Sequence, residues 1–266
     1  MFFLINLYPL GETNLITTMG GSLSLKFELF YGNSMRILFS LINPIKKMII
    51  HTECQVHLFN NIQALRLLRE YNYKDEYKLM KKHIKPIQLG SVWADQNFKS
   101  SSHFYNPKHG KGLFGHSHAL DLAERYYDHA LYSYIIKDYA RAMFYFGACI
   151  HIIQDLTIPQ HVRIRLLDNH RSYENFVKYT FDLVREYRSI DPPIVLKDVK
   201  SYLEYNARIA LRIDREYLDV KPMKIRFFKL TLCSLPLAQS TSAGCMILFM
   251  KDLKRYEKSY VKKKRS

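Results

Sequence analysis

Apolar residues recur at spacings of three and four along most of this chain, which places them on one face of an α-helix. The alternation of apolar and polar residues that marks a half-buried strand is nearly absent. Six segments carry the helical pattern: 57–71, 117–136, 138–156, 172–187, 199–217 and 228–253. We therefore predict an all-α protein, a multi-helix bundle without internal repeats.

Proline and glycine mark the expected breaks between these helices. Pro86 and Gly90 precede the sequence Trp-Ala-Asp, the segment 107–115 is rich in both residue types, and Pro159 follows the third helical segment. A further break is expected at Pro192–Pro193.

Length and composition indicate one sizeable domain. With 266 residues and 48% hydrophobic content the chain can bury a full core, and it falls outside the disordered classes. We assign the domain to residues 48–253. Residues 1–47 are expected to be an N-terminal extension that is unstructured or not native, with Met35 as a candidate later start, and residues 254–266 a basic C-terminal tail.

The first residues read MFFLINLYPLG, an apolar stretch that lacks the basic start of a signal peptide and is interrupted by Pro9. It is too short to cross a bilayer. We expect no signal peptide and no transmembrane helix, and we favour a cytoplasmic protein over a secreted one.

The formal net charge is +16 with histidine neutral. Such a surface favours anionic partners in general, including phosphate esters, acidic lipid surfaces and nucleic acids, so charge alone does not choose among them. Part of the excess lies in the C-terminal tail, for which solvation is the simpler interpretation and attraction to a membrane surface the second.

Residues of the types that bind zinc are concentrated between positions 95 and 174. His151 with Asp155, and His170 with Glu174, lie four residues apart, so both members of each pair project from one helix face. An aspartate in the apolar helix around position 155 is costly unless it is paired or binds a cation. The full candidate set is Asp95, His103, His151, Asp155, His161, His170 and Glu174.

Each candidate also has a simpler structural interpretation. Asp95 fits the N-cap of a short helix, and His161 fits a capping or surface histidine after Pro159. His170 and Glu174 taken alone would be an ordinary exposed pair. The histidines at 83, 109, 116, 118 and 129 fit solvated loops or helix surfaces and are not assigned to the site.

The motifs WADQNFKSSSHFYNP, MFYFGACIHIIQDLTIPQHV and NHRSYENFVKY, in this order, resemble the zinc-dependent phospholipase C family of bacteria, which is related to the S1/P1 nucleases. The resemblance implies a polynuclear zinc site between core helices. Asp95, His103, His151 and Asp155 would hold one zinc, and His161, His170 and Glu174 a second.

At a third zinc, Asp155 would bridge to His57, a position that the resemblance also matches. Secreted relatives complete this site with an N-terminal tryptophan, and no tryptophan lies upstream of His57 here. We therefore expect two tightly bound zinc ions and a weaker third. Asp95 is expected to be the general base, with Glu53 as the alternative.

The resemblance further implies a phosphodiester hydrolase, a phospholipase C that releases diacylglycerol and a phosphorylated head group at a phospholipid or membrane surface. Two positions that are aromatic in choline-specific relatives hold Gln96 and Ser100, while Phe104 retains the third, so phosphatidylcholine is expected to be a poor substrate. An S1/P1-like single-strand nuclease is the alternative enzyme, although nucleic acid is the less favoured partner because the final motif reads HRSYE. A non-catalytic zinc-binding protein is the third possibility.

Overall fold

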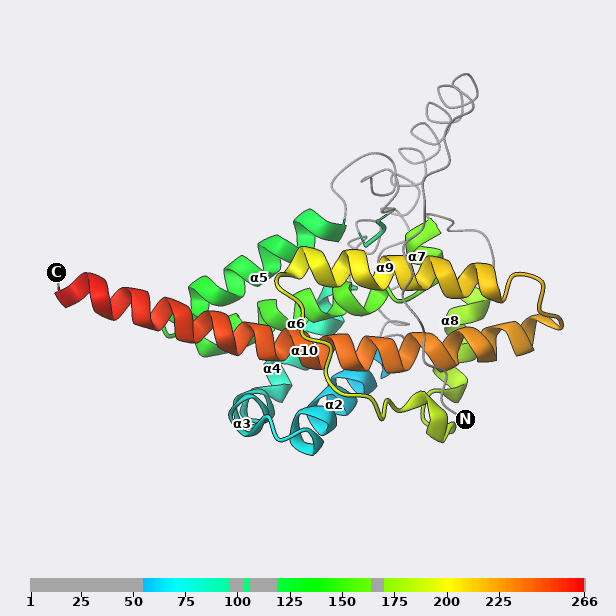
Figure 1. The fold of residues 1–266 in the computed structure, drawn as a ribbon, viewed down its shortest axis with the longest axis horizontal. Helices are drawn as coiled ribbons and strands as arrows, with labels where there is room; N and C mark the ends of the chain where they lie inside the picture. The colour runs from blue at the N-terminus through cyan, green and yellow to red at the C-terminus, as the bar shows by residue number, and fades with distance from the viewer. Residues whose placement is uncertain (1–54, 96–102, 106–118, 164–169, 266) are drawn as a thin grey trace, which may run out of the picture.

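The fold is given by a computed structural model that describes residues 55–95, 103–105, 119–163 and 170–265, with side chains as far as Glu257. Within these ranges there are helices and no strand, which confirms the all-α prediction (Figure 1). The elements are α2 (Gln55–Glu70), α3 (Lys74–Lys82), α4 (Ile84–Ala94), α5 (Ala119–Ile135), α6 (Tyr139–Asp155), α7 (Pro159–Arg163), α8 (His170–Thr180), the 3-10 turn η4 (Arg185–Tyr187), α9 (Val199–Glu216) and α10 (Met223–Arg265).

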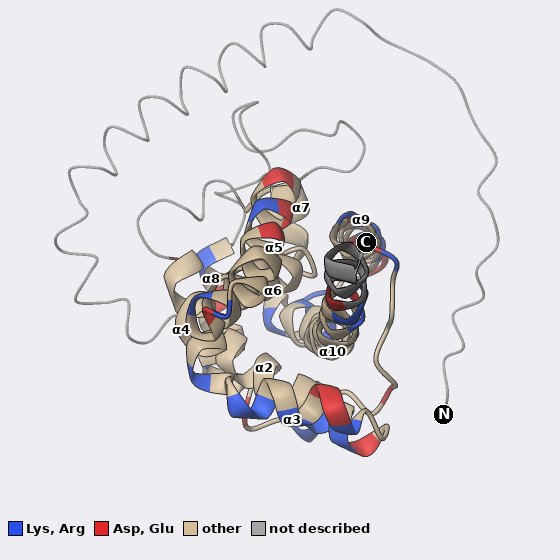
Figure 2. Ribbon diagram, turned by 90° about the vertical axis from the view of Figure 1, so that its left-hand side faces the viewer, with Lys and Arg blue, Asp and Glu red and all other residues tan. Residues whose placement is uncertain are grey.

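Helix α6 is the centre of the bundle and packs against α4, α5, α9 and α10 (Figures 1 and 2). Its N-cap is Asp138, whose side chain accepts a hydrogen bond from the Arg141 backbone N–H at 3.2 Å. Nearly every residue in its last three turns is buried, from Phe146 to Asp155. The helix therefore carries polar residues at its C-terminal end into the interior of the protein.

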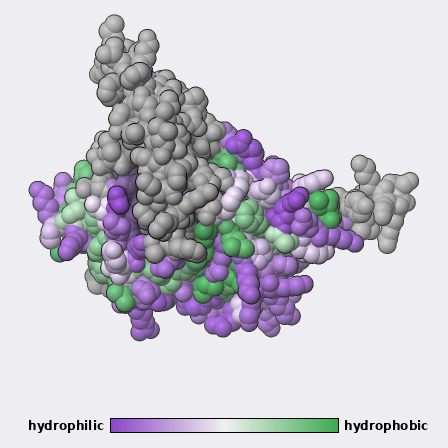
Figure 3. All heavy atoms as spheres, turned by 180° about the vertical axis from the view of Figure 1, so that it is seen from behind, coloured by the Kyte–Doolittle hydropathy of each residue, from purple (hydrophilic) through white to green (hydrophobic). Residues whose placement is uncertain are grey.

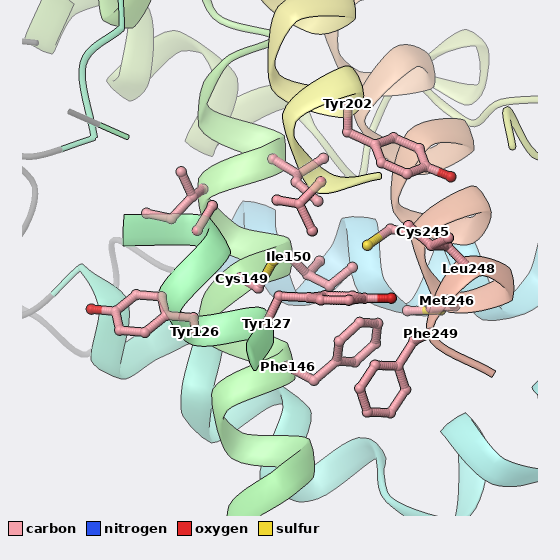
Figure 4. Close-up of a cluster of buried hydrophobic side chains, with 14 of the residues drawn as sticks. Tyr126, Tyr127, Phe146, Cys149, Ile150, Tyr202, Cys245, Met246, Leu248 and Phe249 are labelled. Atoms are coloured by element: carbon pink, nitrogen blue, oxygen red, sulfur yellow. The ribbon is translucent and has the colours of Figure 1, made fainter. Parts of the chain in front are cut away.

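A large part of the apolar core lies where α5, α6, α9 and α10 meet (Figure 4). The rings of Phe146 and Phe249 stack with centroids 4.3 Å apart, and Tyr127 meets Phe249 edge-on at 5.7 Å. Charged residues lie on the outward faces of the helices (Figure 2), and hydrophilic side chains predominate on the face in Figure 3, with apolar patches between them. The periodic apolar faces of the sequence are thus used for packing.

The predicted break at Pro86 and Gly90 is wrong, because both residues lie inside α4. Pro86 occupies the first turn, where a backbone N–H has no partner within the helix and proline is tolerated. Gly90 is needed for packing, since a Cβ at this position would lie 1.8 Å from the carbonyl oxygen of Phe144. A Cβ on Gly147 would lie 1.9 Å from the carbonyl oxygen of Ile87, so α4 and α6 cross almost backbone to backbone.

Helix α10 differs from the prediction at its end, because the segment assigned to a tail after the helix continues it to Arg265. Lysine and arginine are good helix formers and are favoured near a helix C-terminus. By length and composition the segment Met223–Glu257 could cross a membrane, but 72% of its apolar window is buried inside the protein. A buried core helix has the same composition, and α10 packs against α2, α6 and α9.

The helix predicted over 172–187 is also shorter than expected. Helix α8 ends at Thr180, and after a turn the chain forms η4 at Arg185–Tyr187. The N-terminal extension predicted for 1–47 and the alternative base Glu53 lie outside the described residues.

Candidate metal centre

The last turn of α6 supplies a buried histidine and a buried carboxylate on the same face. His151 and Asp155 are 1% and 3% exposed, and His151 Nε2 lies 3.1 Å from Asp155 Oδ2. Burial would raise the pKa of Asp155, but the charges of His151 and His161 and a hydrogen bond from His103 outweigh it and hold the pKa well below its usual range. Asp155 is therefore ionised.

Three further histidines surround this carboxylate. His103 Nδ1 lies 2.7 Å from Asp155 Oδ2, His57 Nε2 lies 3.4 Å from Oδ1, and His161 Nδ1 lies 4.0 Å from Oδ2. His103 lies in the segment 103–105, His57 in α2 and His161 in α7. Because an ionised carboxylate only accepts hydrogen bonds, the short contact places the proton of His103 on Nδ1 and leaves its Nε2 as the donor for a metal.

A second cluster lies where α7 meets the first turn of α8. Pro159 begins α7 and His161 lies in its single turn. His161 Nε2 lies 3.2 Å from His170 Nε2, and His170 Nε2 lies 3.0 Å from Glu174 Oε1. Two imidazole nitrogens facing each other beside a carboxylate is the arrangement that a shared cation produces.

Among the residues that the structure describes, the donor atoms form three groups that could each hold a metal ion, with all atoms of a group within 4.8 Å of one another. The groups are His57, His151 and Asp155; Asp95, His103 and His151; and His161, His170 and Glu174. His151 belongs to two of them, and through Asp155 the whole centre is connected. Mixed imidazole and carboxylate donors suit zinc in an open, catalytic type of site.

Two observations of this structure test the fit to zinc. Four buried ring nitrogens have no hydrogen-bond partner among the described residues: His103 Nε2, both nitrogens of His151, and His161 Nδ1. Two of them, His151 Nε2 and His161 Nδ1, lie 3.1 and 4.0 Å from Asp155 Oδ2. Buried polar atoms are seldom left without a partner, so these nitrogens indicate an absent ligand. In addition, two ligands bound tetrahedrally at zinc are about 3.3 Å apart, close to the 3.2 Å between His161 and His170.

The protonation of two of the histidines, His57 and His161, also suits metal binding. Burial lowers the pKa of His57 to about 4, with the charge of His151 adding to the effect, and burial likewise lowers the pKa of His161 to about 4. Both rings are therefore neutral near pH 7, the form that a metal requires. For His151 and His170 burial is outweighed by the neighbouring carboxylates Asp155 and Glu174, which raise the pKa.

The structure thus brings together all eight residues predicted as metal ligands: His57, Asp95, His103, His151, Asp155, His161, His170 and Glu174. Asp95 is the C-cap of α4 rather than an N-cap. Phe104, expected to contribute to choline recognition, is 1% exposed, and its ring stacks on the candidate ligand His161 with centroids 4.9 Å apart. His83 and His129 lie outside the three groups.

Sequence reasoning missed the polar residues behind the histidines. The buried Gln154 accepts a hydrogen bond from His57 Nδ1 at 2.9 Å and donates to Asn61 Oδ1 and Ser242 Oγ. Asn61 in turn contacts Ser91 at 3.1 Å. A glutamine next to Asp155 in an otherwise apolar helix was the available signal.

Comparison with solved structures shows the same fold in two bacterial toxins. The alpha toxin of Clostridium absonum superposes with a TM-score of 0.64 at 17% identity, and that of Clostridium perfringens with 0.63 at 17%. Each match covers 74% of this chain and 63% of the toxin.

Sequence comparison gives a relative and a family. Phospholipase C of Bacillus cereus is 34% identical over 87 residues, which are 30% of this chain and 31% of the relative, so the match spans about a third of that enzyme. The model of the zinc-dependent phospholipase C family matches residues 56–222, more than half of the chain and the whole described part of the metal centre. The chain therefore belongs to the zinc-dependent phospholipase C family.

Proposed function

We propose that this protein is a zinc-dependent phospholipase C that hydrolyses a phospholipid to diacylglycerol and a phosphorylated head group. The observation that carries the proposal is the set of buried histidine nitrogens that have no hydrogen-bond partner in the described part of the chain, arranged around the ionised Asp155 in a chain of this family. Such donors are costly to bury unless a cation binds them.

Each group of donors would hold one zinc. Asp95, His103 and His151 form the first position, His161, His170 and Glu174 the second, and His57 with His151 and Asp155 the third. Bound zinc ions supply a water of lowered pKa and neutralise the charge of a phosphodiester. We expect two tight ions and a weaker third, because the third position shares His151 with the first.

Three carboxylates of the chain have further roles in the proposed reaction. Asp155 lies within ion-pair distance of His57, His103, His151 and His161 and so fixes the spacing of the centre. Asp95, the partly buried C-cap of α4, is the proposed base for the attacking water. Glu174 is the most open of the paired ligands, with 52% of its side chain exposed, so substrate would approach from the α8 side.

The test is a comparison of substrates on purified, zinc-loaded protein. Vesicles of phosphatidylcholine, of phosphatidylethanolamine and of phosphatidylglycerol, and single-stranded DNA, are assayed in parallel with metal analysis. We expect head-group release that a chelator abolishes and zinc restores, with phosphatidylcholine the poorest lipid. His129→Gln, outside the metal groups, is the matched control for His161→Gln, which should abolish release.

Two results would overturn the proposal. Cleavage of DNA without lipid hydrolysis would assign the centre to a nuclease. Stoichiometric zinc without any hydrolysis would assign it to a structural metal site.

A further inference from the structure

We propose that Ser91, Asn61 and Gln154 form a directional hydrogen-bond chain that sets the tautomer of His57, holding its proton on Nδ1 and presenting the Nε2 lone pair to the metal centre. The chain runs through the interior from α4 through α2 to α6 and back to α2. Its three members are at most 1% exposed, so water does not compete for their hydrogen bonds.

The direction is fixed at the first member. Ser91 Oγ lies 3.0 Å from the carbonyl oxygen of Gly147 and 3.1 Å from that of Ile87. A carbonyl oxygen only accepts, so the Ser91 hydroxyl donates its one proton to the backbone. What remains on Ser91 Oγ is acceptor capacity, and the side-chain amide of Asn61 donates to it at 3.1 Å.

The orientation of the Asn61 amide then fixes the orientation of the Gln154 amide. Because the NH₂ group of Asn61 faces Ser91, its Oδ1 faces Gln154 and accepts from Gln154 Nε2 at 2.9 Å. The second proton of Gln154 Nε2 goes to Ser242 Oγ at 3.0 Å. A reversed Gln154 would oppose its oxygen to that of Asn61, so the amide is held in one orientation.

The last step reaches the metal centre. With its NH₂ group committed, Gln154 presents Oε1 to His57 Nδ1 at 2.9 Å. An amide oxygen only accepts, so Nδ1 carries the proton of the neutral ring. Nε2 lies 3.4 Å from Asp155 Oδ1, longer than a normal hydrogen bond and longer than the 2.9 Å from Nδ1 to Gln154, so it keeps the lone pair, in the group that includes His151. A ligand histidine whose other nitrogen is anchored in this way binds metal more tightly.

The first experiment concerns the metal-free wild-type protein and does not depend on phospholipase activity. Histidine side-chain ¹⁵N shifts near neutral pH, with the His57 signal assigned from its loss in His57→Gln, report which nitrogen is protonated. We expect His57 to carry its proton on Nδ1. Protonation on Nε2 in the folded wild-type protein would refute the chain.

The second experiment removes the acceptor. Gln154→Met keeps the side-chain length but cannot accept from Nδ1, and the shifts of His57 should then report a mixture of tautomers. A second expectation concerns zinc and rests on the proposed function. The affinity of the third position for zinc should fall about 10- to 100-fold. The group of His161, His170 and Glu174 should keep its ion.

The matched control is Gln239→Met. Gln239 is equally buried and also makes three hydrogen bonds, with Asn60, Tyr187 and Ser189, none of which is a histidine. We expect it to lower stability without changing the His57 tautomer. An unchanged tautomer and unchanged third-site affinity in folded Gln154→Met would overturn the proposal. A wild-type tautomer with no third zinc would leave the chain standing and reject that zinc position instead.

Discussion

The two halves of the metal centre are built in different ways. Around Asp155 the histidines are buried, with the side chains of His103 and His151 0% and 1% exposed, and polar residues of α2, α4 and α6 stand behind them. At α8, Glu174 is about half exposed and pairs with His170. The first half is held in place by the fold before any metal binds, whereas the second depends more on the ion itself.

This difference predicts which ligands the centre tolerates losing. Removing a buried, shared carboxylate leaves several histidines without a counter-charge in a medium of low polarity, which is expensive. Removing an exposed carboxylate leaves a position that water can fill. The four predictions below test the contrast, from the largest effect to the smallest.

Asp155→Asn should have the largest effect. It removes the charge that four histidines share, so lipid hydrolysis should fall by more than about 100-fold, beyond the 10- to 100-fold typical of residues that only support a ligand. Zinc should be lost from the buried half, as measured by elemental analysis after gel filtration. Wild-type zinc content and turnover in Asp155→Asn would mean that α6 is purely structural.

Gly90→Ala should damage the buried half through packing alone. The added Cβ would meet the Phe144 carbonyl oxygen at 1.8 Å, so α4 must move away from α6 and carry Asp95 with it. We expect about 1–3 kcal/mol of destabilisation, measured by urea unfolding. Lys85→Ala, on the exposed side of α4, is the control and should be nearly neutral. Equal stability of the two variants would contradict the close crossing of the helices.

Glu174→Gln should have a milder effect on the exposed half. Activity at low zinc should fall roughly tenfold, the lower end of the effect of perturbing a zinc site, and excess zinc should restore it because water can take the open position. Titration of activity against free zinc measures this shift. A loss as deep as that of Asp155→Asn, not rescued by zinc, would show that the two halves are equally rigid.

The pH dependence of the metal-free protein should show the smallest net effect. The pKa values of His57 and His161 are lowered to about 4, so the folded protein binds these protons more weakly than the unfolded chain. Their contribution to stability is therefore present above the ordinary pKa of about 6.5 and is lost as the pH falls towards 4. His151 and His170 have raised pKa values and oppose this loss.

Urea unfolding at pH 7 and pH 5 with a chelator present separates these contributions. Stability should fall between the two values, His161→Gln should flatten the dependence, and His170→Gln should make it steeper. A wild-type protein that gains stability at pH 5 would reverse the sign and contradict the burial of the two neutral rings.

Helices with a strong apolar period could be predicted closely from the sequence. The segment predicted over 199–217 is α9, Val199–Glu216, and the one predicted over 138–156 is α6, Tyr139–Asp155. The short helices α3 and α4 were missed. In α4 proline and glycine have roles that depend on a partner helix, which a local pattern does not reveal.

In the metal centre, too, local features could be predicted from the sequence and long-range contacts could not. The spacing of His151 and Asp155, and of His170 and Glu174, follows from helix geometry and predicted which side chains share a face. The bonds of Gln154 join positions 57, 61 and 242, and such long-range contacts leave no local trace in one sequence. The contact of Phe104 with His161 was missed for the same reason.

The order of the ligands along the chain has a consequence for how the protein assembles. Helix α6 and its neighbours α4 and α5 are close in sequence and can pair early, but His57 must join from far upstream and Glu174 from downstream. Contacts between distant positions form late, because a long loop has to close first. In the exposed half, which the fold supports less, a zinc ion bound at His161 would thus act as a template on which the α8 segment closes, making metal supply during synthesis a determinant of how fully that half forms.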